Sequence, residues 1–281
     1  MIPVTGSRRS TDSAPTALRG LMWAGFCLSL LLPTAFAILV WYDLDRENAY
    51  ASERARIVAQ AVQRQLVERL DWLTAELQDT TERASSTASG DAVPQLSAPP
   101  SDERGLGTAL QDLVLLRADG TALDAQGKPI DRTSLPKPDR DAQPAGLAIG
   151  APVRAANARW LVPVAWTDAS GAGVAARIDA DWFATLLKGY DLGPDSMLNL
   201  LHRDHVMLAR SQDNQRHVGT RLDGIPLFDA AYRDMAAGVY IDPTTVIDGV
   251  PRQIVFQRVP HSPLIVLVGS ARHPLLAGWR R

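Results

Sequence analysis

Apolar residues run without a charge from residue 21 to residue 42. At 1.5 Å of rise per residue, a helix over this run would be about 33 Å long, which is enough to cross a bilayer core. Trp23, Trp41 and Tyr42 stand near the two ends of the run, where amphipathic rings favour the level of the lipid headgroups. The pattern therefore predicts one transmembrane helix over residues 21–42.

The charges on either side of this run differ in sign, which predicts its orientation. Three arginines and one aspartate precede it, and three acidic residues and one arginine follow it. Before the run these are Arg8, Arg9, Asp12 and Arg19, and after it Asp43, Asp45, Arg46 and Glu47. Because positive charge stays on the cytoplasmic side, residues 1–20 are expected to form a cytoplasmic tail and the rest of the chain to be exported. A cleaved signal peptide is the alternative, since residues 35–37 read Ala-Phe-Ala. The main domain is exported under either interpretation.

Residues 43–83 contain no proline or glycine and carry apolar residues at spacings of three or four. This period predicts a long amphipathic helix, about 60 Å in length, that continues the transmembrane helix as a stalk. Two helices that break near Asp71 also fit the pattern. Residues 84–105 show no period and are rich in Ser, Pro and Ala, so they are expected to form a linker. The apolar stripe consists of Val58, Val62, Leu66, Leu70, Leu73 and Leu77.

After residue 105 the pattern changes to short apolar runs between turn residues, which is typical of antiparallel strands. A first series predicts strands at 113–116, 160–166 and 173–178 and a helix at 181–187. A second series predicts strands at 197–201, 206–210, 239–247, 252–259 and 264–269 and a helix at 226–235. Because a similar order occurs twice, we expect two α+β lobes, at 106–190 and 191–272, followed by a juxtamembrane end at 273–281.

Composition narrows the class of protein. Of 281 residues, 46% are hydrophobic and 21% are charged, which is ordinary for a globular domain. A net charge of -2 lacks the clustered cations with which proteins contact phosphates, so no nucleic-acid partner is expected. Cys27, the single cysteine, lies inside the apolar run, so no intrachain disulfide forms.

Motifs for catalysis are absent from the sequence. It contains no G-x-S-x-G, P-loop or H-E-x-x-H pattern. His202 and His205 have an H-x-x-H spacing that would hold a metal if both rings converged, but they flank a predicted hairpin turn, which favours a solvated turn. We therefore expect no enzyme, with no catalytic residue, no metal and no cofactor.

A group of aromatic and charged residues is the best candidate for ligand binding. Tryptophan rings with a guanidinium and a carboxylate suit a small zwitterion or organic acid, through cation-π contacts and paired hydrogen bonds. The alternative places the tryptophans in the core and the arginines at the surface. Asp179 and Asp181 also suit helix capping better than acid-base chemistry. The candidate ligand-binding residues are Arg154, Arg159, Trp160, Trp166, Asp179 and Trp182.

Several stretches resemble the Cache sensor domains of bacterial signalling proteins, in particular the periplasmic input regions of diguanylate cyclases and sensor histidine kinases. The resemblance lies in their order behind a membrane anchor and a long helix. Two departures are the absence of a tyrosine after Arg159 and Trp160, and His205 where a turn glycine is usual. The stretches are 149–153 (IGAPV), 160–164 (WLVPV), 173–183 (GVAARIDADWF), 200–210 (LLHRDHVMLAR) and 263–269 (PLIVLVG).

This resemblance implies a double Cache fold, with two PAS-like antiparallel-sheet lobes packed on the stalk. It implies a bacterial inner-membrane protein whose membrane-distal lobe, 106–190, binds a small organic acid, amine or amino-acid-like molecule in the periplasm. It also implies a homodimer through the stalk helix, and an output domain that these 281 residues do not include. A membrane-tethered protein-interaction module with no small ligand is the alternative, and an exported hydrolase is a third hypothesis.

Overall fold

The computed structural model describes residues 14–87, 110–131, 146–190, 192 and 195–271. The chain divides into two compact units, residues 1–50 and 51–281. Helix α1, Ala14–Thr87, contributes to both units. Within it, the side chains of residues 14–28, 32, 43–45, 47–48 and 86–87 are not described. Parts of three predicted segments lie outside the described residues. They are residues 1–13 of the tail predicted at 1–20, residues 88–105 of the linker predicted at 84–105, and the whole juxtamembrane end at 273–281.

The first unit is represented by the beginning of α1, which contains Pro33. Most of its described large apolar side chains are exposed, and Val40 is half-buried. When only the residues with described side chains are considered, no helix is both long enough and apolar enough to cross a membrane. The span predicted at 21–42 includes residues 21–28 and 32, which lie outside those side chains, so it stays a prediction. The exposed large apolar residues of this unit are Leu30, Leu31, Phe36, Ile38, Leu39, Trp41, Tyr42 and Tyr50.

In the second unit, α1 buries one stripe of apolar residues. Their spacing of three or four residues places them on a single face of the helix. The helix passes Asp71 without a break and ends at Thr87, beyond the predicted end at residue 83. The long helix expected from the sequence is therefore confirmed. The buried stripe consists of Ala55, Ala59, Val62, Leu66, Leu70, Leu73, Leu77 and Ala84.

The first lobe is an antiparallel sheet in the order β2-β1-β6-β5-β3, with β4 also paired to β5. A bulge between Gln111 and Val114 shifts the register of β1 against β6, and Asp112 within it has a φ of 53°. The strands are β1 Leu110–Leu116, β2 Ala122–Asp124, β3 Gly146–Ile149, β4 Val153–Arg154, β5 Trp160–Thr167 and β6 Gly173–Asp179.

Helix α3, Ala180–Leu187, leads from β6 to the second lobe. This lobe is a second antiparallel sheet, in the order β8-β7-β11-β10-β9. A one-turn helix α4, Asn214–His217, and a 3-10 helix η2, Pro226–Phe228, follow β8. The α+β class with two antiparallel sheets is thus confirmed. The strands are β7 Met197–His202, β8 Val206–Arg210, β9 Ala237–Asp242, β10 Arg252–Arg258 and β11 Leu264–Ala271.

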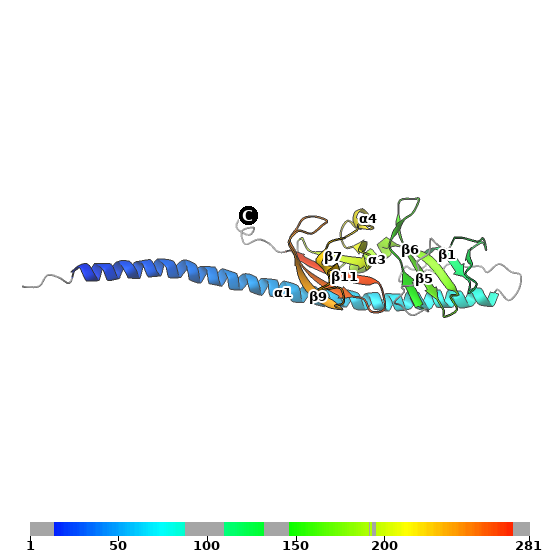
Figure 1. Ribbon diagram of the computed structural model, residues 1–281, viewed down its shortest axis with the longest axis horizontal. Helices are drawn as coiled ribbons and strands as arrows, with labels where there is room; N and C mark the ends of the chain where they lie inside the picture. Colours follow the sequence, from blue (N-terminus) through cyan, green and yellow to red (C-terminus); the bar gives the residue numbers. More distant parts are fainter. Residues whose placement is uncertain (1–13, 88–109, 132–145, 191, 193–194, 272–281) are drawn as a thin grey trace, which may run out of the picture. The chain divides into compact units, whose positions relative to one another are not determined.

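One core joins the helix to both sheets. The stripe of α1 packs in the same cluster as Val162 and Val174 of the first sheet and Val255 and Val266 of the second. The cyan part of α1 runs alongside both sheets in Figure 1. Each large apolar side chain that is fully buried stabilises the fold by about 1.5–3 kcal/mol. This cluster is therefore the main attachment of the lobes to the helix.

The remaining faces of the two sheets are covered unequally. On the second sheet, a separate cluster of eleven buried residues includes Met207, Leu227 and Phe256. On the first sheet the corresponding cluster has five buried residues, among them Ala165 and Ala175. The second lobe is therefore filled by its own side chains to a greater extent than the described part of the first.

Two predicted elements differ from the structure. The helix expected at 226–235 is a single 3-10 turn, because the residues after Phe228 are exposed, except for the half-buried Tyr232, and offer no apolar face to bury. The strand expected at 239–247 ends at Asp242, since Pro243 has no N–H for a ladder and begins the loop to β10.

Candidate functional site

Four of the six predicted ligand-binding residues gather at one end of the first sheet. Arg154 pairs with Trp160 across β4 and β5, and its guanidinium lies 5.8 Å from the centroid of the Trp160 ring. Arg159 forms an ion pair with Asp179 at the end of β6. The Arg159 side chain is 53% exposed and that of Asp179 is 7% exposed, so the pair reaches from the surface into the lobe.

Asp179 also caps α3, as the sequence indicates. Its Oδ1 atom accepts a hydrogen bond of 2.9 Å from the backbone N–H of Asp181. Asp181 in turn accepts hydrogen bonds from Asn214 (2.7 Å) and Gln215 (2.8 Å) of α4. The predicted cluster therefore sits where the first lobe, α3 and the second lobe meet.

Trp166 and Trp182 lie apart from this cluster. Trp166 is half-buried near the other end of β5, opposite Leu147 and Val174, and six residues of strand separate it from Trp160 by about 20 Å. Trp182 is buried in α3, where its ring meets Phe183 edge-on. The structure therefore does not bring these two tryptophans to Arg154 and Arg159.

The two histidines of the H-x-x-H pattern have separate partners. His202 is buried, and its Nε2 lies 3.0 Å from the carbonyl oxygen of Ile149 in the first lobe, so Nε2 carries the proton. His205 stacks on Phe228 at 3.7 Å and lies 3.0 Å from Asp223. The described residues include no group of three or more His, Cys, Asp or Glu side chains that could hold a metal ion.

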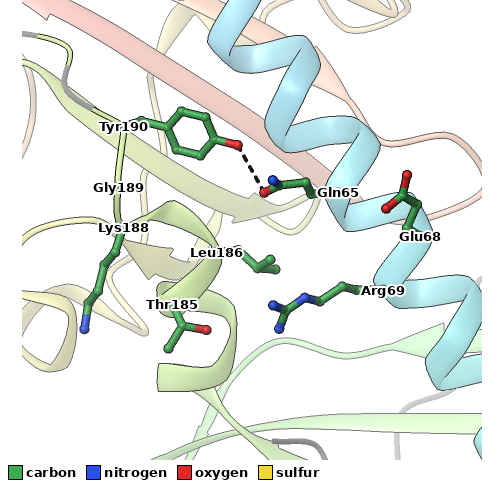
Figure 2. A pocket seen from close by; sticks show the side chains of 8 residues that line it. All are labelled: Gln65, Glu68, Arg69, Thr185, Leu186, Lys188, Gly189 and Tyr190. Atoms are coloured by element: carbon green, nitrogen blue, oxygen red, sulfur yellow. Dashed lines mark hydrogen bonds between the residues drawn. The ribbon is translucent and has the colours of Figure 1, made fainter. Parts of the chain in front are cut away.

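A groove of about 750 Å³ lies between α1 and the end of α3, and it is shown in Figure 2. This volume falls within the range of small-molecule sites. Arg69 reaches from α1 towards α3, beside Leu186, and Tyr190 lies above them (Figure 2). The groove is lined by Gln65, Glu68, Arg69, Thr185, Leu186, Lys188, Gly189 and Tyr190.

Two interactions hold the walls of this groove together. The Tyr190 hydroxyl donates a hydrogen bond of 3.1 Å to Oε1 of Gln65, which ties the segment after α3 to α1 (Figure 2). Burial raises the pKa of the Tyr190 phenol, so it remains a neutral donor. The Arg69 guanidinium lies 5.2 Å from the centroid of the Trp182 ring, a cation-π contact that orients it.

The charge of the groove suits an anionic group. Arg69 and Lys188 are cations and Glu68 is the one acidic residue of the lining. A guanidinium presents paired N–H donors that match a carboxylate, while Leu186 offers an apolar contact. A molecule in this groove would contact both α1 and the helix that joins the two lobes.

The sequence predicted none of the residues that line the groove as ligand-binding residues. It predicted Trp182, which contacts Arg69 and does not line the groove. Tyr190 and Gln65 are 125 residues apart in the chain, so their contact depends on how α1 packs on the lobes. The weak signal in the sequence was that Gln65, Glu68 and Arg69 lie one turn apart on the polar side of an amphipathic helix.

Comparison with known families gives one match. Residues 180–269 match the family model dCache_1_like, described as a histidine kinase sensor domain. This range begins at α3 and covers most of the second lobe. A search of curated proteins found no match.

Solved structures share the fold over most of the chain. The extracellular domain of rpHK1S-Z16, assigned as a histidine kinase, is 21% identical with a TM-score of 0.51, and the match covers 83% of this chain and 95% of that domain. The ligand-binding domain of the chemoreceptor PctB from Pseudomonas aeruginosa PAO1, in complex with L-Arg, is 16% identical with a TM-score of 0.50, over 81% and 96% of the two chains.

The ligand-binding domain of Mlp24 with asparagine is 15% identical, with a TM-score of 0.50 over 83% of this chain and 95% of that domain. The sequence match in the second lobe and the fold shared over both lobes confirm the resemblance to Cache-type sensor domains.

Proposed function

We propose that the chain is the small-molecule input module of a bacterial transmembrane signalling protein, with its lobes in the periplasm. The observation that carries this proposal is the groove between α1 and α3, because a ligand there contacts the long helix and the joint between the lobes together. If α1 and the lobes adopt two conformations, a ligand that binds one of them more tightly increases the population of that conformation. A sensor acts through such a shift. The output it controls would be a histidine kinase or a diguanylate cyclase.

The ligand class follows from the groove and from the predicted cluster. Arg69 and Lys188 favour a carboxylate, and Glu68, the acidic residue of the lining, suits an amine. The solved relatives with L-Arg and asparagine add support for an organic acid, amine or amino-acid-like molecule.

The predicted cluster of Arg154, Arg159, Trp160 and Asp179 is a second position for the ligand in the same lobe. It lies at the N-terminal end of α3, whereas the groove lies at the C-terminal end. Trp182 is connected to the groove through Arg69. Trp166 lies about 20 Å along β5 from Trp160, so a small ligand at this cluster would not contact it.

The membrane anchor at 21–42, with a cytoplasmic N-terminus, is part of this proposal. Seven large apolar side chains among the described residues of 21–42 are exposed, and exposed apolar residues on such a helix are typical of contact with lipid. We also propose that two copies pair through α1, so that ligand binding in the lobes acts on a helix pair. Sedimentation of the purified chain at several concentrations tests the pairing.

Thermal unfolding of the full chain in detergent, against a library of organic acids, amines and amino acids, tests the sensor function. A ligand at a hundred times its Kd stabilises the folded state by about 2.7 kcal/mol. The melting temperature should therefore rise by roughly 5–10 °C for a true ligand. If no compound raises it, the proposal is wrong and a membrane-tethered interaction module without a small ligand is the better account.

A further inference from the structure

Two buried arginines in the second lobe share one carboxylate. Arg210 ends β8 and Arg252 begins β10, and their side chains are 7% and 3% exposed. Asp248, in the loop at 243–250 between β9 and β10, forms ion pairs with both. The buried pair therefore carries two positive charges against the single negative charge that bridges it.

The contacts of Asp248 are those of a bound carboxylate. Arg252 donates to both of its oxygens, at 2.5 Å and 2.9 Å, which is the paired geometry that guanidinium groups offer to carboxylate ligands. Arg210 donates to Oδ2 at 3.2 Å, and the Thr245 hydroxyl donates to Oδ1 at 2.6 Å. Each oxygen thus accepts two hydrogen bonds from side chains.

The surrounding residues hold the two guanidinium groups in place without Asp248. Nε of Arg252 donates to the carbonyl oxygen of Asp195 at 2.9 Å. Nη1 of Arg210 lies 3.5 Å from Oδ1 of Asn199, which is buried. These contacts come from β7 and the segment before it, outside the 243–250 loop, so the arginines are prepositioned by the sheet.

The carboxylate lies on the solvent side of the arginines. The Asp248 side chain is 31% exposed, in contrast to the buried side chains of Arg210 and Arg252. Val246, two residues before it in the loop, is 59% exposed. Removal of the Asp248 carboxylate would therefore open a path from solvent to two buried cations.

We propose that Arg210 and Arg252 form a carboxylate-binding site in the second lobe, which Asp248 occupies as an internal ligand that fastens the 243–250 loop. A small monocarboxylate from solution takes its place when the loop is released. Because Asp248 is tethered, it has an effective concentration in the millimolar range or above, so the native chain favours the internal ligand.

The site lies at the end of the second sheet, so whether Asp248 or a free carboxylate occupies it affects the neighbouring strands. Arg252 pairs with Asp242 of β9 on one side and with Ala271, the last residue of β11, on the other. Exchange of Asp248 for a free carboxylate frees the loop at the end of the sheet where β11 leaves the lobe. The site is independent of the groove at Arg69 and of the proposed ligand there.

Chemical rescue of Asp248→Ala by acetate tests the proposal in the full chain in detergent. The variant should melt roughly 4–12 °C below the native chain in sodium chloride, because two buried cations lose their carboxylate. Sodium acetate at equal ionic strength should restore at least half of this loss in a saturable manner. It should leave the native chain unchanged.

Asp223→Ala is the matched control, because Asp223 pairs with Arg221 at the surface of the same lobe, where the two side chains are 57% and 62% exposed. Acetate should have no effect on it beyond that of chloride. Equal responses of Asp248→Ala to acetate and chloride would overturn the proposal. If that variant does not fold in chloride, preparation in acetate should recover folded protein, and failure in both salts also overturns the proposal.

Discussion

The ring of Trp160 in the first lobe lies directly over the backbone of Gly219 in the second. A Cβ atom added to Gly219 would lie 2.3 Å from Cη2 of Trp160, which is closer than any van der Waals contact allows. Gly219 also has a φ of 80°, a backbone conformation that favours glycine. Trp160 therefore serves as a contact between the lobes whether or not it binds a ligand.

Gly219→Ala should weaken this contact. We expect a loss of about 2–4 kcal/mol in the free energy of unfolding, from the displaced ring together with the strained backbone. Gly224→Ala is the control, because Gly224 has a φ of 85° but no atom within 4 Å of an added Cβ. It should lose only about 1 kcal/mol. Urea unfolding measures both, and equal losses would show that Trp160 does not resist displacement.

The attachment of the lobes to α1 depends on its buried stripe. Leu66 is 0% exposed, so Leu66→Ala should lower the free energy of unfolding by about 2–5 kcal/mol through the cavity it leaves. Ile57 lies on the same helix and is 57% exposed, so Ile57→Ala should change it by about 0.5 kcal/mol or less. Urea midpoints compare the two variants, and similar effects would contradict the packing described for α1.

The Asp248 site should make stability depend on acid. Burial raises the pKa of Asp248, but the hydrogen bonds from Arg252 and Thr245 outweigh it and hold the pKa well below the usual 3.8. A carboxyl group with a lowered folded pKa stabilises the fold above its unfolded pKa, and this contribution disappears as the pH falls through the folded value.

Asp248→Asn should consequently be less stable than the native chain by about 1–3 kcal/mol at neutral pH, a range reduced for the partial exposure of the carboxylate. The difference should narrow as the pH falls below about 4, because the unfolded chain then binds a proton at Asp248 that the folded carboxylate does not bind. Urea midpoints from neutral pH downwards measure it. A difference that stays constant with pH would contradict the charge interaction.

The sequence predicted the elements whose signals are local. The sequence indicated Asp179 or Asp181 as the cap of α3, and Asp179 is the cap. The apolar period of α1 predicted its buried face. His205 has a φ of 65°, as expected for a residue that replaces a turn glycine. Strands β3 and β4 were not predicted as strands, since a run of two to four residues carries too little pattern to identify.

The groove and the Asp248 site could not be predicted because their residues come together only through tertiary packing. Arg69 meets Trp182 because α1 packs along both sheets, and no local pattern encodes that pairing. Arg210 ends a strand and Arg252 begins one, where a charged residue is normally at the surface. Their burial depends on the loop carboxylate of Asp248 and on contacts with Asp195 and Asn199, which the sequence does not reveal.

The proposed membrane anchor predicts which residues of α1 tolerate charge. Leu31 and Leu39 are exposed apolar residues within 21–42, and arginine in a lipid-embedded helix costs up to about 2.5–3.5 kcal/mol per residue. The double variant Leu31→Arg, Leu39→Arg should be depleted from carbonate-washed membranes. Tyr50→Arg with Ile57→Arg, exposed residues beyond the span, should remain with the membranes. Release of the native chain by carbonate would contradict the anchor.

Calorimetric titration of the best compound from the ligand screen into three variants tests the central claim most directly. Arg69→Gln removes the guanidinium of the groove, and Arg159→Gln removes the guanidinium that pairs with Asp179 in the predicted cluster. Arg64→Gln replaces an exposed arginine elsewhere on α1. For a carboxylate in the groove, Arg69→Gln should raise Kd at least tenfold, equivalent to about 1.4 kcal/mol, while the other two leave it unchanged. A loss confined to Arg159→Gln would place the ligand at the predicted cluster instead, and equal affinity in all three variants would contradict a ligand at either position.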